Sequence, residues 1–185
     1  MGLFSFLRRP AAPAPVARAA VAPRAAVAPA KGKVRTRLVA GTALAAACCG
    51  VLTQLEGIET VAYRDVVGIP TACVGETKGI RMGMTFTKPQ CEAMLLKRLV
   101  EDFAPAMEAC ARQPMGDDQY AANLSLAYNI GSSAYCKSSV ARLWNQGDRR
   151  ASCNAFLMWN KAGGRVIPGL TRRREIERAM CLKGV

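Results

Sequence analysis

An uncharged stretch of eighteen residues, Leu38 to Leu55, constrains the structure of this chain more than any other feature. As a helix it would extend roughly 27 Å, close to the thickness of the hydrocarbon core of a bilayer. Its alanines, glycines and threonines make it far less hydrophobic than a Leu- or Ile-rich anchor, so its residence in a membrane should be marginal. We therefore predict that residues 38–55 form a signal-anchor segment that can leave the bilayer again.

The charges around this segment predict its orientation. Residues 1–37 hold eight Lys or Arg and no acid, and no basic residue follows Leu55 until Arg64. Because basic residues stay on the cytoplasmic side, the N-terminus should lie in the cytoplasm and the C-terminal part in the periplasm. We expect the protein to sit in the inner membrane through residues 38–55 and then to be released to the periplasm.

Residues 1–37 themselves form a basic tail of low complexity. Ala and Pro dominate it, and Arg-Ala-Ala-Val-Ala-Pro occurs twice in succession, at 18–23 and 24–29. Such a segment has too little bulky apolar content to close a core, so we predict disorder. No aromatic residue follows Phe6 in this tail, which argues against a nucleic-acid partner.

The sequence leaves other interpretations of the anchor open. The small residues Ala45–Ala47 are typical of a signal-peptide cleavage site, and Cys48 could end a lipoprotein signal. A third interpretation is an Ala-rich helix buried in a cytosolic protein, which would leave the charge asymmetry without a cause.

The chain contains no histidine, which removes the usual general base of Ser and Cys hydrolases and the commonest neutral zinc ligand. Its eight cysteines lack CxxC spacing, so a zinc ribbon or a thioredoxin-like site is not expected. They fit the structural disulfides of an exported protein, although several could instead be buried apolar residues of a reduced protein. Connectivity stays open, because six cysteines allow fifteen pairings and eight allow 105. We expect no metal or organic cofactor, and carboxylates must perform any acid–base chemistry.

The pattern after Leu55 predicts an α+β fold. Gly-, Thr-, Val- and Pro-rich sequence up to Thr87 indicates the strands and turns of a small β lobe. Thr87 then resembles a helix N-cap, and apolar spacing up to Cys110 predicts a long amphipathic helix with a kink or break near Ala104, before Pro105. A further helix is predicted to open at 116–118 and to end at 129–131, and others cover roughly 138–146, 148–160 and 170–182, forming a mainly helical lobe joined to the β-rich one.

Two carboxylates, Glu56 and Asp65, stand nine residues apart at the start of this region. Cleavage of a glycosidic bond needs one carboxylic acid to protonate the leaving oxygen and a second carboxylate across the sugar. An acid at a helix end and one in a following hairpin can face each other in this way. Spacing alone does not exclude that both are solvated surface charges.

The run Glu56-Gly57, Tyr63-Arg64-Asp65, Gly68, Thr71 and Gly75 resembles the active-site signature of family 24 glycoside hydrolases, the phage lysozymes. The separations of nine and six between Glu, Asp and Thr match that signature. The similarity extends through nearly all of residues 52–185. Segments similar to the helical lobe of lambdoid phage endolysins are Asn129–Gly131, Asn145–Asp148, Trp159–Gly164 and Gly169–Glu175.

The resemblance implies a two-lobed phage-lysozyme fold for the catalytic domain, residues 56–185, and a muramidase that cuts the bond between N-acetylmuramic acid and N-acetylglucosamine to lyse the host. It implies that Glu56 is the general acid, that Asp65 orients water or stabilises developing positive charge, and that Thr71 holds the water, with inversion as the outcome. We expect a monomer. The alternatives are a catalytically silent wall-binding protein of the same fold and a membrane-anchored interaction protein.

The Ala/Gly content of residues 38–55 resembles that of signal-arrest-release endolysins. Glu56 lies one residue beyond this segment, so in the tethered protein it must sit at the membrane surface. Catalysis tolerates little displacement of its groups, so the tethered form should be silent. We expect release to let the C-terminal part of the segment fold as the first helix of the soluble domain, which would place Glu56.

Some side chains receive structural interpretations. Many relatives carry histidine after the glycine at position 75, whereas this chain has Glu76, which either raises the pKa of a neighbour or points into solvent. Glu59 is expected on the exposed side of its turn. The run Arg172–Arg178 predicts a solvated helix face with i,i+3 and i,i+4 ion pairs. Trp144 and Trp159 are predicted to be core residues rather than sugar platforms.

Overall fold

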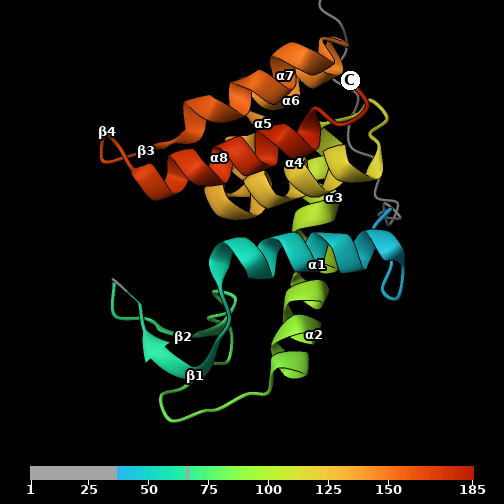
Figure 1. The fold of residues 1–185 in the computed structure, drawn as a ribbon. Coiled ribbons are helices and arrows are strands. Elements are labelled where there is room, and N and C mark those ends of the chain that lie inside the picture. Colours follow the sequence, from blue (N-terminus) through green and yellow to red (C-terminus); the bar gives the residue numbers. More distant parts are fainter. Residues whose placement is uncertain (1–36, 66) are drawn as a thin grey trace, which may run out of the picture. The chain divides into compact units, whose positions relative to one another are not determined.

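Two hydrophobic cores organise residues 37–65 and 67–185, the part of the chain that the computed structural model describes (Figure 1). The larger core is built by helices and includes fully buried Leu52, Leu124 and Trp144. The smaller core joins two strands and the helix that follows them, through Ala72, Cys91 and their neighbours. The predicted α+β division into a small β-rich part and a mainly helical part is confirmed. The tail predicted for residues 1–37 lies, except for Arg37, outside the described residues.

Helix α1 (Ala43–Glu56) occupies most of the uncharged stretch. The hydroxyl of Thr42 accepts the backbone N–H of Ala45, which satisfies a donor that the first turn leaves unpaired. The helix stops at Gly57, whose φ of +80° a residue with a side chain rarely adopts. Its buried residues, which lie on the face toward the larger core, are Leu44, Ala45, Cys48 and Leu52. Among the described residues, no helix has both the length and the apolar character needed to cross a bilayer.

Strands β1 (Glu59–Arg64) and β2 (Pro70–Cys73) form an antiparallel hairpin. Tyr63 lies opposite Thr71, and Ala72 pairs with Glu76 in a tight corner after β2. Glu59 is exposed, as predicted.

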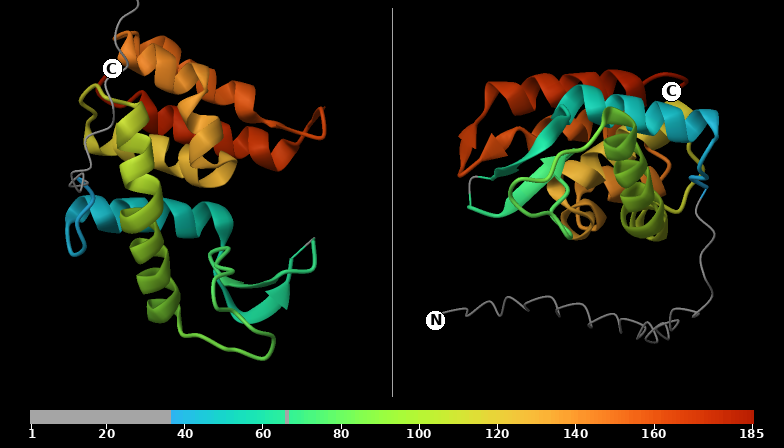
Figure 2. Two further views of the ribbon diagram at one scale, coloured as in Figure 1. Left: turned by 180° about the vertical axis from the view of Figure 1, so that it is seen from behind. Right: turned by 90° about the horizontal axis from the view of Figure 1, so that it is seen from below.

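A long column of helix connects the two cores, as Figure 2 shows from behind. It consists of α2 (Lys88–Arg98), a π-helical turn η1 (Leu99–Phe103) and α3 (Ala104–Cys110). The predicted N-cap at Thr87 is confirmed and forms a capping box with Gln90. Pro105 lacks an N–H and would crowd the carbonyl four residues before it, and the column widens there, with the Ala104 N–H reaching Leu99 five residues back. The predicted break is therefore a π-helical turn, and the column continues beyond it.

The remaining elements form the helical part around α4 (Asp117–Ile130), which is buried along most of its length. Trp144 is buried, as predicted. The short α5 and the β3–β4 turn were not predicted. In chain order the other elements are α5 (Ser132–Cys136), α6 (Ser139–Asn145), α7 (Arg149–Ala155), the 3-10 turn η2 (Phe156–Trp159), β3 (Lys161–Ala162), β4 (Arg165–Val166) and α8 (Pro168–Cys181).

Disulfides fasten these elements together, which confirms the prediction of structural disulfides. Cys73–Cys91 joins β2 to α2, Cys110–Cys136 joins α3 to α5, and Cys153–Cys181 joins α7 to α8. Cys48 and Cys49 on α1 are free, and Cys48 is buried.

Candidate active site

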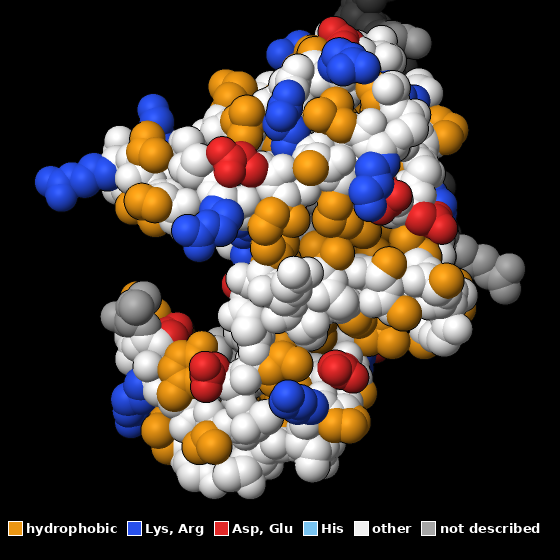
Figure 3. Space-filling model, viewed as in Figure 1, with side chains coloured by type: hydrophobic (Ala, Val, Ile, Leu, Met, Phe, Trp, Pro, Cys, Tyr) orange, Lys and Arg blue, Asp and Glu red, His pale blue; other side chains and the backbone are white. Residues whose placement is uncertain are grey.

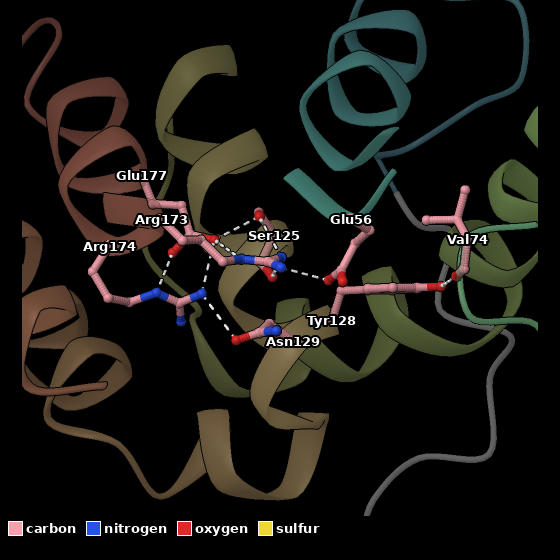
Figure 4. A network of polar contacts seen from close by, with 8 residues as sticks. All are labelled: Glu56, Val74, Ser125, Tyr128, Asn129, Arg173, Arg174 and Glu177. Carbon is pink, nitrogen blue, oxygen red and sulfur yellow. Dashed lines mark hydrogen bonds and ion pairs between the residues drawn. The ribbon is translucent and has the colours of Figure 1, made fainter. Parts of the chain in front are cut away.

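Glu56 is the last residue of α1 and points out of that helix toward α8 (Figure 4). Its carboxylate lies 2.5 Å from Nη1 of Arg173, and its side chain is 28 % exposed. Because Gly57 ends the helix immediately afterwards, the acid stands at a fixed helix end beside an arginine. The predicted position of Glu56 at the end of an apolar helix is confirmed.

Arg173 belongs to a buried ion network on α8. Its Nε lies 3.1 Å from Oε1 of Glu177, which is fully buried, and Ser125 on α4 donates its hydroxyl to the same oxygen. Arg174 also pairs with Glu177, at 3.0 Å. Burial raises the pKa of Glu177, and Arg174, Ser125 and Arg173 act in the opposite direction. With Glu56, two cations meet two anions in this network.

The predicted solvated face of α8 is therefore wrong. Arg173 and Arg174 pair with Glu177 at the expected i,i+4 and i,i+3 spacings, but all three side chains are buried. The reason is tertiary: this face of α8 packs against α4 and the end of α1, where the charges neutralise one another. Buried charges persist only when they are paired in this way.

Tyr128 on α4 links Glu56 to the end of the hairpin. Its hydroxyl donates to the carbonyl of Val74, and its ring packs on Phe103 with centroids 4.8 Å apart. Burial raises the pKa of Tyr128 to about 12; Arg98 and Arg173 act to lower it, and Glu56 and Glu76 act to raise it. Figure 4 shows the phenol extending from beside Glu56 to Val74.

Asp65 and Thr71 meet around Ile69, in the turn between β1 and β2. Oδ1 of Asp65 accepts the backbone N–H groups of Val67 at 3.0 Å and Ile69 at 2.8 Å. The hydroxyl of Thr71, which is 3 % exposed, donates to the carbonyl of Ile69 at 3.0 Å. The structure thus brings these two predicted residues together and places Glu56 in a separate network. In the described part of the chain, no hydrogen bond or ion pair joins Glu56 to either of them.

Glu76 supports the corner that follows β2. Its Oε1 accepts the N–H groups of Thr77 and Lys78 at 3.0 and 2.8 Å, and Arg98 lies 3.5 Å away. Arg98 also donates to the carbonyl of Gly75 at 3.4 Å and lies over the ring of Phe103. Of the two alternatives for Glu76, pointing into solvent is wrong, because its side chain is 14 % exposed and is held by these backbone groups and Arg98.

Sequence reasoning missed Arg173, Tyr128 and Arg98 as parts of this site. The segment that contains Arg173 carried part of the family resemblance, but nothing in it indicates a partner 117 positions away. Tyr128 lies within a predicted helix, with no signal that its side chain belongs to the site. Its hydroxyl partner, Val74, is 54 positions away.

The surface is hollowed between the hairpin β1–β2 and the part formed by β3, β4 and α8 (Figure 3). Glu56 reaches the α8 side of this region through Arg173, whereas Asp65 and Thr71 belong to the hairpin side. An inverting glycosidase needs two carboxylates far enough apart to admit a sugar and a water molecule, and here they come from different elements with no contact between them.

Comparisons with known proteins identify relatives of this chain. The phage lysozyme family matches residues 53–177. The SAR-endolysin of Enterobacteria phage P21 is 39% identical over 131 residues, covering 70% of this chain and 79% of the relative, and that of Pseudomonas phage phiKMV is 39% identical over 148 residues, covering 77% and 90%. The crystal structure of a mutant P22 lysozyme superimposes with a TM-score of 0.68 at 37% identity, covering 73% of this chain and 94% of that one.

Proposed function

The chain belongs to the phage lysozyme family, and we propose that it hydrolyses the bond between N-acetylmuramic acid and N-acetylglucosamine in peptidoglycan. It is a lysozyme-type glycoside hydrolase and an endolysin. The family match includes Glu56, Asp65 and Thr71. The observation that carries the proposal is their distribution: one carboxylate on the helical side and a carboxylate with a hydroxyl on the hairpin.

In this proposal Glu56 is the general acid that protonates the leaving oxygen. Arg173 holds its carboxyl group in one orientation from the buried side, because the guanidinium is itself fixed by Glu177 and Ser125. A catalytic group must be held within a fraction of an ångström of its working position. Arg173 is thus a positioning residue.

Asp65 and Thr71 act on the other side of the sugar. Asp65 uses Oδ1 for the turn N–H groups, and no described residue donates to Oδ2, which leaves that oxygen for water or developing positive charge. Thr71 lies at the base of the same turn, where its hydroxyl also has acceptor capacity for a water proton. Attack by this water from the face opposite Glu56 gives inversion.

The reaction is tested by digesting purified Gram-negative sacculi and identifying the new reducing ends. Borohydride reduction followed by mass spectrometry should show reduced N-acetylmuramic acid, and the matched Glu56→Gln variant should produce none. New reducing ends on N-acetylglucosamine would contradict the proposed bond. Sedimentation with sacculi, without any product, would favour the silent wall-binding alternative.

We further propose that residues 38–55 first anchor the protein in the inner membrane and later leave it uncut. Two relatives at 39% identity are named SAR-endolysins. The exposed face of α1 is compatible with both water and lipid, because its residues are small and uncharged. They are Ala43, Ala46, Ala47 and Gly50. In the anchored state Glu56 would lie at the membrane surface, away from Arg173, so formation of α1 in the core also forms the site.

Arg37 adds a requirement to this sequence of events. The backbone N–H of Arg37 donates to Glu108 at 2.9 Å, and its guanidinium contacts the Met115 carbonyl and Asp117. The next residue, Leu38, is 1 % exposed in the larger core. A residue from the basic flank of the anchor therefore belongs to the folded domain, and release must carry it across the membrane.

Anchoring is tested by raising the hydrophobicity of the exposed face alone. Ala46→Leu, Ala47→Leu and Gly50→Leu together should stabilise the membrane-inserted state by a few kcal/mol, on the order of 0.5 to 1 kcal/mol per substitution. The folded domain accepts them, since Ala46 and Ala47 are exposed and nothing lies within 4 Å of a side chain built at Gly50. Gly41, with a φ of +82°, and buried Ala45 stay unchanged.

The leucine variant should remain in the membrane fraction and fail to lyse cells, and the matched Ala46→Ser, Ala47→Ser variant should be released earlier. Release of the leucine variant at the wild-type rate would contradict the proposal. A periplasmic chain that begins near Cys48 or Cys49 by mass spectrometry would show cleavage instead.

A further inference from the structure

A groove of about 440 Å³ lies next to the site, between the corner that follows β2 and the column formed by α2 and η1. Its charged lining residues are Glu76, Lys78, Lys97, Arg98, Glu101 and Asp102. Both signs of charge are therefore present in equal number. Met94 and Thr77 complete the lining.

The groove adjoins the network that contains Glu56 and Tyr128. The Tyr128 hydroxyl holds the Val74 carbonyl, and Glu76 follows two residues later. The Tyr128 phenol extends from beside Glu56 to Val74, so it connects the Glu56 side of the site to the corner that carries Glu76 (Figure 4). The groove therefore lies on the hairpin side of this phenol, next to the candidate site.

The walls of the groove are rigid. The Cys73–Cys91 disulfide joins β2 to α2, and Ala72 and Glu76 exchange two backbone hydrogen bonds of 2.9 Å. Glu76 and Arg98 are held by each other and by backbone groups. Because these side chains and the backbone are already ordered, little binding free energy is lost in ordering them when a ligand binds.

The other charges on the groove are free to bind. Within the described chain, the side chains of Lys78, Lys97, Glu101 and Asp102 have no hydrogen bond or ion pair. Charged side chains of this kind contribute most to binding when a ligand supplies the opposite charges.

We propose that this groove binds the peptide stem of peptidoglycan, which rests on the function proposed above. The sugars of a stem-bearing glycan strand are uncharged, because the lactyl carboxyl of muramic acid forms an amide bond with the peptide. Every charge of such a strand is on the peptide, which carries carboxylates and, in Gram-negative walls, a free amino group. Lys78 and Lys97 meet the carboxylates, and Glu101 and Asp102 meet the amino group.

The test compares intact sacculi with glycan strands stripped of peptide by an amidase, using the full-length protein. Stripped strands carry one carboxylate on each muramic acid and no amino group. The Glu101→Gln, Asp102→Asn variant should raise KM about tenfold on sacculi, since one charge-assisted contact is lost, and leave KM on stripped strands unchanged. N-acetylation of the sacculi removes the charge of the peptide amino group. It should therefore raise the KM of the wild type about as much as the substitutions do, and leave the KM of the variant unchanged.

Control variants remove single charges of the same sign from α2 outside the groove. Glu92→Gln and Lys88→Gln should leave KM on sacculi unchanged, whereas Lys97→Gln should raise it. Thermal unfolding checks that the exposed substitutions leave the fold intact. Equal effects on both substrates, or groove variants that match their controls, would overturn the inference. Failure of the wild type to cut either substrate would instead overturn the proposed function.

Discussion

Glu56 and Asp65 are held by contacts of different range. Glu56 pairs with Arg173, which is 117 residues away in the sequence, and Arg173 is fixed by further buried charges. Asp65 accepts backbone N–H groups two and four residues ahead of it. The position of Glu56 therefore depends on the packing of α1, α4 and α8, whereas the turn around Asp65 needs only its own hairpin.

This difference matches the two states proposed for the chain. A turn built from neighbouring residues can form whether or not α1 is in the core. The ion pair of Glu56 cannot form until α1 reaches α8. The helical side of the site is therefore the part that release would control.

The largest expected effect is on catalysis by Glu56→Gln, which should lower kcat by about 10²- to 10⁴-fold because an amide cannot donate the required proton. The amide oxygen still accepts from Arg173, so thermal unfolding should change little. Clearing of permeabilised Gram-negative cells measures the activity. Retention of more than a few per cent of it would remove Glu56 as the general acid.

Arg173→Met should lower the free energy of unfolding by about 3 kcal/mol, because it leaves part of the charge of buried Glu177 uncompensated. Urea denaturation measures this. The control is Arg172→Met at the exposed neighbouring position, which should change stability by less than about 0.5 kcal/mol. Adding Glu177→Gln to Arg173→Met should recover part of the loss. Equal stability of the Arg172 and Arg173 variants would show that the network does not hold the helical side together.

Asp65→Asn should lower activity by about 10²- to 10³-fold, as for loss of one preorganised charge at a reacting centre. Stability should stay close to wild type, because the amide oxygen can still accept the turn N–H groups. Asp65→Ala, which removes that acceptor, should lower stability by about 1 kcal/mol. Thr71→Ala should also be severely impaired in activity. If Asp65→Asn destabilised the protein as much as Arg173→Met, the local description of the turn would be wrong.

Tyr128→Phe should have the smallest effect, because it keeps the ring on Phe103 and removes one hydrogen bond between α4 and the hairpin. We expect a loss of about 1 kcal/mol in stability and about fivefold in activity. The pKa of Tyr128 is raised from 10.0 to about 12, so the folded state keeps its proton where the unfolded chain loses it. The free energy of unfolding should therefore fall as pH rises through this window, and fall less in the variant. An identical alkaline profile in both proteins would contradict this.

Much of the fold was predictable because its signals are local. The N-cap at Thr87, the end of a helix at Glu56 and the helix before Gly131 follow from side chains that bond or break the backbone within four residues. The turn around Asp65 is local too, since its hydrogen bonds reach only Val67 and Ile69, but Asp65 and Thr71 were predicted as site residues from the family resemblance and not from this turn. Disulfide pairing could not be predicted, since it depends on which helices meet.

The sequence by itself determined which residue types are available for chemistry: carboxylates without histidine, spaced as in a known family, behind a weakly apolar segment with a basic flank. Only the tertiary structure decided how those residues are held. The arginines of α8 have the spacing of a solvated face, yet they are buried because that face packs on α4 and meets the end of α1. Spacing along a helix sets which residues share a face. Whether that face meets water or another helix is decided by packing between segments far apart in the chain, and on that choice depends whether an ion pair is a weak surface contact or holds a catalytic group in place.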